Sequence, residues 1–143
     1  MLAKRLIGAL LVLIALLSFW AWAKGLRVTP STYYWRKVEV GKKVKMPVPL
    51  EISNQSDGER RYRLKVVPSN VFVSRLVSFS ENNFTILPRK TKKVDVYLEL
   101  PKEEVSFGNG FEFYIEVKEE AKRGERFALT CYPKIVVKTK KSF

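Results

Sequence analysis

The side chains that could do chemistry are few in this sequence, and their spacing does not favour catalysis. The chain has no histidine, which is the commonest general base and metal ligand in proteins. Glu112 and Glu116 would share one face of a strand, where strand geometry separates their carboxylates by about 13 Å. A retaining glycosidase needs a much closer pair of carboxylates. We therefore predict no enzyme activity, no cofactor and no metal site.

Cys131 is the single cysteine of the chain, so a disulfide within the chain is impossible. It lies on the apolar parity of the last predicted strand. This position favours a buried thiol that packs as a small hydrophobic residue. A reactive thiol, or one that pairs with another chain, is the alternative that the sequence leaves open.

Basic side chains are the stronger chemical signal, because 27 Lys and Arg face 14 Asp and Glu and the formal net charge is +13. One exposed row on a predicted strand and one basic turn form a candidate basic patch, made of Arg61, Arg63, Lys65, Arg89, Lys90, Lys92 and Lys93. Such patches attract phosphates, anionic lipid head groups and acidic polymers. Solubility, protection of sheet edges or adaptation to high temperature would explain the same charges without a ligand.

The N-terminal 23 residues have the pattern of a secretory signal peptide. Lys4 and Arg5 precede an almost wholly apolar run over residues 6–22, and Ala21-Trp22-Ala23 matches the cleavage site. Cleavage would leave residues 24–143 as one mature domain. An uncleaved membrane anchor is the alternative, because the apolar run is somewhat long. Both readings predict an exported protein, periplasmic or extracellular, for which nucleic acid is not an expected partner.

The most regular part of the remaining chain is a predicted β-hairpin with one continuous apolar face. A charged turn over residues 119–125 joins its two strands. The apolar parity consists of Phe111, Phe113, Ile115 and Val117 in the first strand and Leu129, Cys131, Pro133, Ile135 and Val137 in the second. An apolar face of this kind requires an opposing sheet.

Shorter alternating runs supply the strands for that sheet. They cover residues 44–52, 62–66, 84–88 and 94–100, with turn signals between them. The region 68–80 is less regular and predicts a short strand or a long crossing connection. If the strands around the turn Asn54–Gly58 pair with each other, Lys43 and Lys45 extend the basic row of Arg61. The spacing predicts an all-β sandwich with no convincing amphipathic helix after the N-terminal segment.

Two further motifs have both a functional and a structural reading. Tyr33, Tyr34 and Trp35 are either a stacking platform for sugars or a partner, or aromatic packing at the edge of the sandwich. Asn54-Gln55-Ser56 and Asn83-Phe84-Thr85 match the N-glycosylation sequon. We interpret both sequons first as turn chemistry.

Four stretches have a characteristic order in this chain. They are the turn glycine and strand from Gly41 to Asn54, the run 84–88 with its basic turn, the strand that begins at 111–114, and the last strand 127–137. In this order they resemble the N-terminal immunoglobulin-like domain of periplasmic pilus-assembly chaperones. The resemblance implies a seven-stranded antiparallel immunoglobulin-like β-sandwich over residues 24–143.

In that family the last strand is exposed and adds to an incomplete partner subunit, filling the partner's groove with alternating apolar side chains. The matching candidate partner-binding edge here consists of Leu129, Cys131, Pro133, Ile135 and Val137. The family holds its client's carboxylate with an arginine and a lysine, and at those positions this chain has Tyr33 and Val136. A shifted register would bring Arg36 or Lys134 to that role.

The sequence leaves two functions open. The first is a non-enzymatic domain that binds another protein of the cell envelope or surface, chaperone-like or as part of a pilus or surface assembly, by edge-strand or sheet-face contacts. The second is a basic module that binds anionic polymers or membrane surfaces. The sequence does not indicate an oligomeric state.

Overall fold

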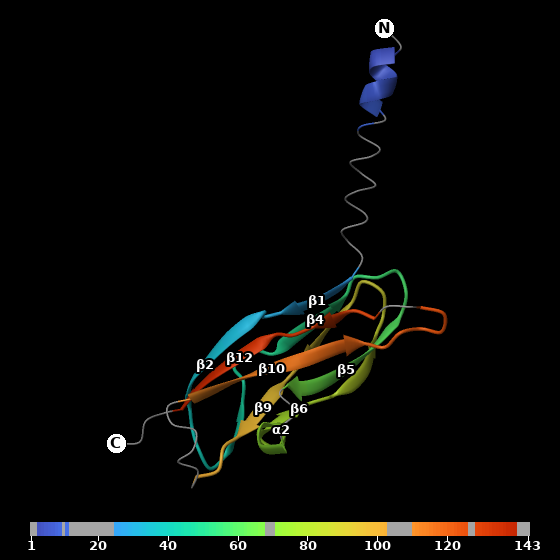
Figure 1. Cartoon of the computed structure of the whole chain (residues 1–143). Helices are drawn as coiled ribbons and strands as arrows, with labels where there is room; N and C mark the ends of the chain where they lie inside the picture. Colours follow the sequence, from blue (N-terminus) through green and yellow to red (C-terminus); the bar gives the residue numbers. More distant parts are fainter. Residues whose placement is uncertain are drawn as a thin grey trace.

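The structure, a computed structural model, describes residues 3–9, 11, 25–67, 71–102, 110–125 and 128–139. From residue 25 onwards the described chain is almost entirely β-structure in packed sheets (Figure 1), so the all-β prediction is confirmed. Residues 3–9 are helical. The predicted cleavage site lies outside the described residues. Among those described, no helix is long and apolar enough to cross a membrane.

One layer of the fold is a six-stranded sheet that contains the predicted hairpin. Its strands, in spatial order, are β2 (Thr32–Val38), β12 (Lys134–Thr139), β10 (Gly110–Glu119), β5 (Arg60–Val67) and β7 (Asn83–Ile86), and β11 (Thr130–Cys131) also pairs with β10. The pair β2–β12 is parallel and the other pairs are antiparallel. The hairpin prediction is therefore confirmed, with its second strand divided at Tyr132 and Pro133.

The opposing layer is built from two three-stranded sheets that follow on from each other. Their strands are β1 (Leu26–Thr29), β4 (Leu50–Asn54) and β8 (Thr91–Val94), then β3 (Lys43–Lys45), β9 (Val96–Glu99) and β6 (Val77–Phe79). Pro47 and Pro49 lie between β3 and β4, where a proline cannot donate to a ladder. The Met46 N–H bridges the gap by donating to the Val96 carbonyl at 2.8 Å. Such interruptions divide the predicted strands, so the described chain has more and shorter strands than the seven expected.

The core lies between the two layers and follows the predicted alternation. Side chains with no exposed area come from both layers: Phe113, Ile115, Val117, Ile135 and Val137 from one, and Leu50, Ile52, Val94, Val96 and Leu98 from the other. Burying a side chain of this size stabilises the fold by about 1.5–3 kcal/mol. This face-to-face burial holds the sandwich together.

The turn after β4 crosses between the layers, because β4 pairs with β1 and β8 whereas β5 pairs with β10 and β7. The strands on either side of this turn therefore do not pair with each other. Lys43 and Lys45 lie in the layer opposite Arg61, and the idea that they extend its basic row is wrong. A tight turn carries no mark in the sequence that distinguishes a hairpin from a crossing.

The irregular region 68–80 contains a short helix, α2 (Val71–Leu76), which leads directly into β6. The sequence, in which no convincing amphipathic helix was expected here, did not predict this short helix, while the expected short strand is present. A helix of fewer than two turns presents too few residues for a helical period to show.

Candidate functional site

The last strand, β12, is not at an open edge of its sheet. β10 pairs with it on one side and β2 on the other, with Ile135 opposite Tyr33 and Val137 opposite Trp35. Ile135 and Val137 have no exposed area, and Pro133 is also buried. The prediction that these residues form a partner-binding edge is corrected here: they fill the core of their own domain. A strand that donates apolar residues and a strand that buries them have the same alternation.

The preceding strand, β11, has a different environment, because β10 alone pairs with it in the described part of the chain. The Leu129 carbonyl accepts from the Glu119 N–H at 2.9 Å, and the Pro133 carbonyl accepts from the Ile115 N–H at 3.0 Å. Backbone groups alternate in direction along a strand, so the N–H and C=O of the intervening Thr130 and Tyr132 point away from β10. Leu129 and Tyr132 are 47% and 53% exposed. We name the segment 128–132 the half-edge.

β2 does not reach the half-edge, because the chain changes layer between Thr29 and Pro30, and β1 lies beside the half-edge without forming a ladder with it. Before that point β1 pairs with β4 in one layer, and after it β2 pairs with β12 in the other. Beside the half-edge the Cys131 Sγ lies 3.9 Å from the Leu26 carbonyl oxygen. Burial raises the pKa of the Cys131 thiol, so it stays protonated at neutral pH and packs as a small residue.

β2 forms one outer edge of the six-stranded sheet (Figure 1). The Ser31 carbonyl accepts from the Lys134 N–H at 2.9 Å, so alternation turns the backbone groups of Thr32, Tyr34 and Arg36 outward. The predicted aromatic platform is divided by the same alternation. Trp35 is 2% exposed in the core, whereas Tyr34 is 59% exposed.

The candidate basic patch is spread over both layers rather than gathered in one place. Arg61 and Arg63 lie on β5, where the Arg61 Nε donates to the Asn83 Oδ1 at 2.9 Å and Arg63 lies 3.4 Å from Glu120. Lys65 follows them on β5, opposite Glu116 of β10. Glutamates on neighbouring segments therefore lie beside the basic side chains of this row.

The other basic residues of the patch lie at the turn before β8 and on β8 itself. Three have an acidic partner: Arg89 with Asp57 at 2.8 Å, Lys92 with Glu81 at 2.9 Å and Lys93 with Glu51 at 3.8 Å. Lys90 is exposed in the same turn. Exposed pairs of this kind contribute about 0–1 kcal/mol. Their partners come from distant segments, so composition alone could not reveal the compensation.

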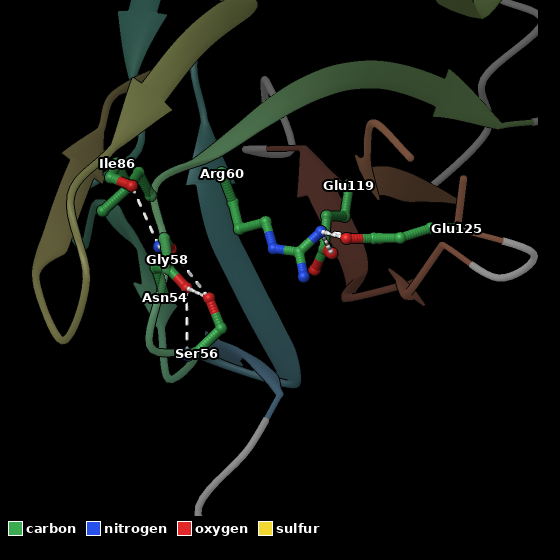
Figure 2. Close-up of polar contacts among 7 residues, drawn as sticks. All are labelled: Asn54, Ser56, Gly58, Arg60, Ile86, Glu119 and Glu125. Atoms are coloured by element: carbon green, nitrogen blue, oxygen red, sulfur yellow. Dashed lines mark hydrogen bonds and ion pairs between the residues drawn. The ribbon is translucent and has the colours of Figure 1, made fainter. Parts of the chain in front are cut away.

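A partly buried ion cluster that the sequence reasoning missed lies near the half-edge (Figure 2). The Arg60 Nη1 lies 3.2 Å from Glu119 and 2.7 Å from Glu125. Burial raises the pKa of Glu119, whereas the hydrogen bond from Arg60 lowers the pKa of Glu125. Arg60, Glu119 and Leu129 line a cavity of about 300 Å³. Within the described ranges no group of three His, Cys, Asp or Glu side chains is placed to hold a metal ion.

The two sequons differ in their accessibility. Asn54 has no exposed area, and its Nδ2 donates to the carbonyl oxygens of Gly58 and Ile86, each at 2.9 Å (Figure 2). Its Oδ1 accepts from the Ser56 N–H at 3.0 Å. The side chain therefore has a structural role, as expected for turn chemistry, and is closed to modification in the folded state. Asn83 is exposed at the start of β7.

Solved structures of other proteins share this fold, although the sequence itself has no match. No protein-family model matches the sequence, and no curated protein matches it. PapD-like domain 7 of human CEP192 matches with a TM-score of 0.62 and 11% identity over 82% of this chain and 87% of that one. The periplasmic chaperone SfaE matches at 0.61 and 12%, over 82% and 59%. The Salmonella enterica SafA pilin in complex with the SafB chaperone matches at 0.59 and 7%, over 81% and 55%.

At these identities the likeness concerns the fold, which does not by itself carry a function. The chain spans little more than half the length of the two bacterial structures. Its two layers, its order of strands and its matches agree with the resemblance that the sequence suggested. The chain has the immunoglobulin-like β-sandwich fold that PapD-like domains share with periplasmic pilus chaperones.

Proposed function

We propose that this protein is an exported, non-enzymatic domain that binds another protein of the cell envelope by β-strand addition, in a chaperone-like role or within a surface assembly. The observation that carries the proposal is the half-edge, where Thr130 and Tyr132 direct backbone groups away from β10 that have no backbone partner among the described residues. Adding a strand to an exposed sheet edge is a common mode of peptide recognition. Structures titled as a periplasmic chaperone and as a pilin–chaperone complex share the fold, which supports this role.

Side chains beside the half-edge would supply most of the affinity. Each added backbone hydrogen bond contributes only about 0.5–1.5 kcal/mol net, and the half-edge is short. Leu129 and Tyr132 present large exposed apolar surfaces next to it. Tyrosines are enriched among the residues that dominate binding energy at interfaces. On the adjoining sheet face, the Tyr132 hydroxyl lies 3.4 Å from Glu116, so a partner on the half-edge would extend over that face.

The test is capture of partners from native envelope extract by the full chain, followed by elution in a salt gradient and mass spectrometry. Leu129→Asp should abolish capture of a protein that the wild type retains at high salt. Val48→Asp is the matched control, because Val48 is 44% exposed between β3 and β4 in the opposing layer. Equal retention by all three proteins would contradict the proposal. Capture of acidic polymers or lipids alone, lost at moderate salt, would favour the basic-module alternative.

A further inference from the structure

The outer edge of β2 is a second uncovered strand edge, separate from the half-edge. In the described part of the chain β2 pairs only with β12, and Thr32, Tyr34 and Arg36 turn their backbone N–H and C=O groups outward. Lys37 has a φ of 56°, in the left-handed region, which ends the regular extended edge. We infer that the β2 edge binds an acidic, extended segment of a partner protein.

Among the described residues, two basic side chains lie together on the outer face beside this edge. The parallel register sets Val137 opposite Trp35 and Thr139 opposite Val38, which brings Lys138 beside Arg36 on the outer face. Neighbouring like charges on one sheet face are destabilising. No ion pair of Arg36 or Lys138 is recorded among the described residues. An acidic side chain placed between these two cations would relieve the repulsion.

Two acidic residues near this edge are already paired with other cations, Glu39 with Lys42 and Glu112 with Lys134. Glu112 lies on β10, opposite Val136 of β12, and its carboxylate lies 3.1 Å from the Lys134 Nζ. That pair is internally compensated, so the excess charge of Arg36 and Lys138 remains. The face therefore has a place for carboxylates from outside the chain.

The same charges disfavour a second copy of this chain as the occupant. Pairing β2 with its own copy would bring together two chains of formal net charge +13. It would also set the Arg36 and Lys37 of both copies along one edge. Basic residues on an edge strand are a common device against such self-pairing. An acidic strand of another protein satisfies the open backbone groups without this repulsion.

The alternation of β2 specifies the pattern of the segment that it binds. Side chains of an added strand would point alternately to the outer face, beside Tyr34 and Arg36, and to the inner side, beside Tyr33. Tyr33 is partly buried and packs against the core. The matching segment therefore has carboxylates on its outer parity and apolar residues on its inner parity.

Amide hydrogen exchange, followed residue by residue by NMR on the full chain, tests this inference. The probe is a short synthetic peptide of alternating valine and glutamate. Its binding should slow exchange at the amides of Thr32, Tyr34 and Arg36, which have no backbone partner among the described residues. The same peptide with alternate N-methyl groups along one edge should not bind, because it cannot pair. A valine–lysine peptide should not bind either, because its charge is wrong.

Two charge-reversal variants test whether the peptide binds at the β2 edge or is attracted to the basic protein in general. Arg36→Glu should weaken binding of the valine–glutamate peptide about tenfold or more. Lys93→Glu makes the same change of charge on the opposite layer, where the side chain is 71% exposed, and should weaken it much less. Equal losses in the two variants, or unchanged exchange at Tyr34 and Arg36, would overturn the inference.

The residues whose amides the peptide protects from exchange show which of the two edges it binds, and so distinguish this inference from the proposed function. Protection of Thr130 and Tyr132 without Tyr34 and Arg36 would assign the peptide to the half-edge, which overturns the inference and supports the proposed function. Phosphatidylglycerol vesicles that protect the Tyr34 and Arg36 amides as strongly as the peptide would also overturn it. They would show that a lipid surface, not a protein strand, occupies the β2 edge.

Discussion

The Nδ2 of Asn54 donates to the carbonyl oxygen of Ile86 at 2.9 Å and joins the ends of β4 and β7 (Figure 2). Both strands end where the chain leaves one layer for the other. The backbone completes the link, because the Asn54 carbonyl accepts from the Arg89 N–H and the Asn54 N–H donates to the Lys90 carbonyl, both at 2.9 Å. A single buried amide thus couples two crossings that are far apart in sequence.

Replacing Asn54 by alanine should destabilise the protein by about 2–3 kcal/mol, because the Ile86 and Gly58 carbonyls lose the hydrogen bonds of its buried amide. Urea unfolding followed by circular dichroism measures the loss. Asn54→Asp is the matched control: it keeps an oxygen that accepts from the Ser56 N–H but loses the amide donor. It should be destabilised as well. A change below about 0.5 kcal/mol for Asn54→Ala would contradict the structural role.

Tyr62 is fully buried on β5, and its hydroxyl has no hydrogen-bond partner among the residues that the structure describes. Burial raises the pKa of Tyr62 to about 12, with a further contribution from the charge of Glu119. An unfolded tyrosine titrates near pH 10, so its phenolate forms more easily in the unfolded state. The stability linked to Tyr62 is therefore complete below about pH 10 and is lost as the pH rises towards 12.

Tyr62→Phe tests this assignment, because it removes the titrating group and keeps the ring. At pH 7 the variant should be as stable as the wild type or slightly more stable, since the hydroxyl makes no bond. Between pH 10 and 12 it should lose less stability than the wild type in urea unfolding. Lysines titrate over the same range in both proteins, so their effect cancels in the difference between the two free energies of unfolding. Parallel curves over that range would show that the hydroxyl reaches water.

Arg60→Met should destabilise the protein by about 2–3 kcal/mol at pH 7, because Glu119 then stays buried without its cation. The double variant Arg60→Met with Glu119→Gln should recover much of this loss. Thermal unfolding of the single and double variants gives the coupling energy. If Glu119→Gln rescued nothing, Arg60 would act through packing and not through the ion pair.

The pH dependence of the Arg60→Met variant has a definite sign. The pKa of Glu119 is already raised by burial, and losing Arg60 raises it further, so protonation in acid relieves the buried charge. The destabilisation should therefore be largest at neutral pH and shrink as the pH falls. Glu125 behaves oppositely in the wild type. Its lowered pKa means that its ion pair stabilises the fold above the ordinary glutamate range and is lost in acid.

The structure confirms those parts of the sequence analysis that depend on the direction of a side chain. Phe113 and Ile115 of the first hairpin strand, and Ile135 and Val137 of the second, all face the core as their parity predicts. Alternation along a strand is a local property of the backbone, so the chain itself determines which residues share a face. The sequence alone therefore determined an all-β sandwich and most of its core.

Which strand lies beside which was decided only by the tertiary structure. Alternation does not specify a neighbour, so it could not show that β2 covers β12 and leaves β11 half open. For the same reason the pairing of Arg60 with Glu119 was invisible, because it forms only when β5 and β10, which are distant in sequence, pair in one sheet. The open edges, which the proposed binding depends on, follow from where the chain changes layer between Thr29 and Pro30.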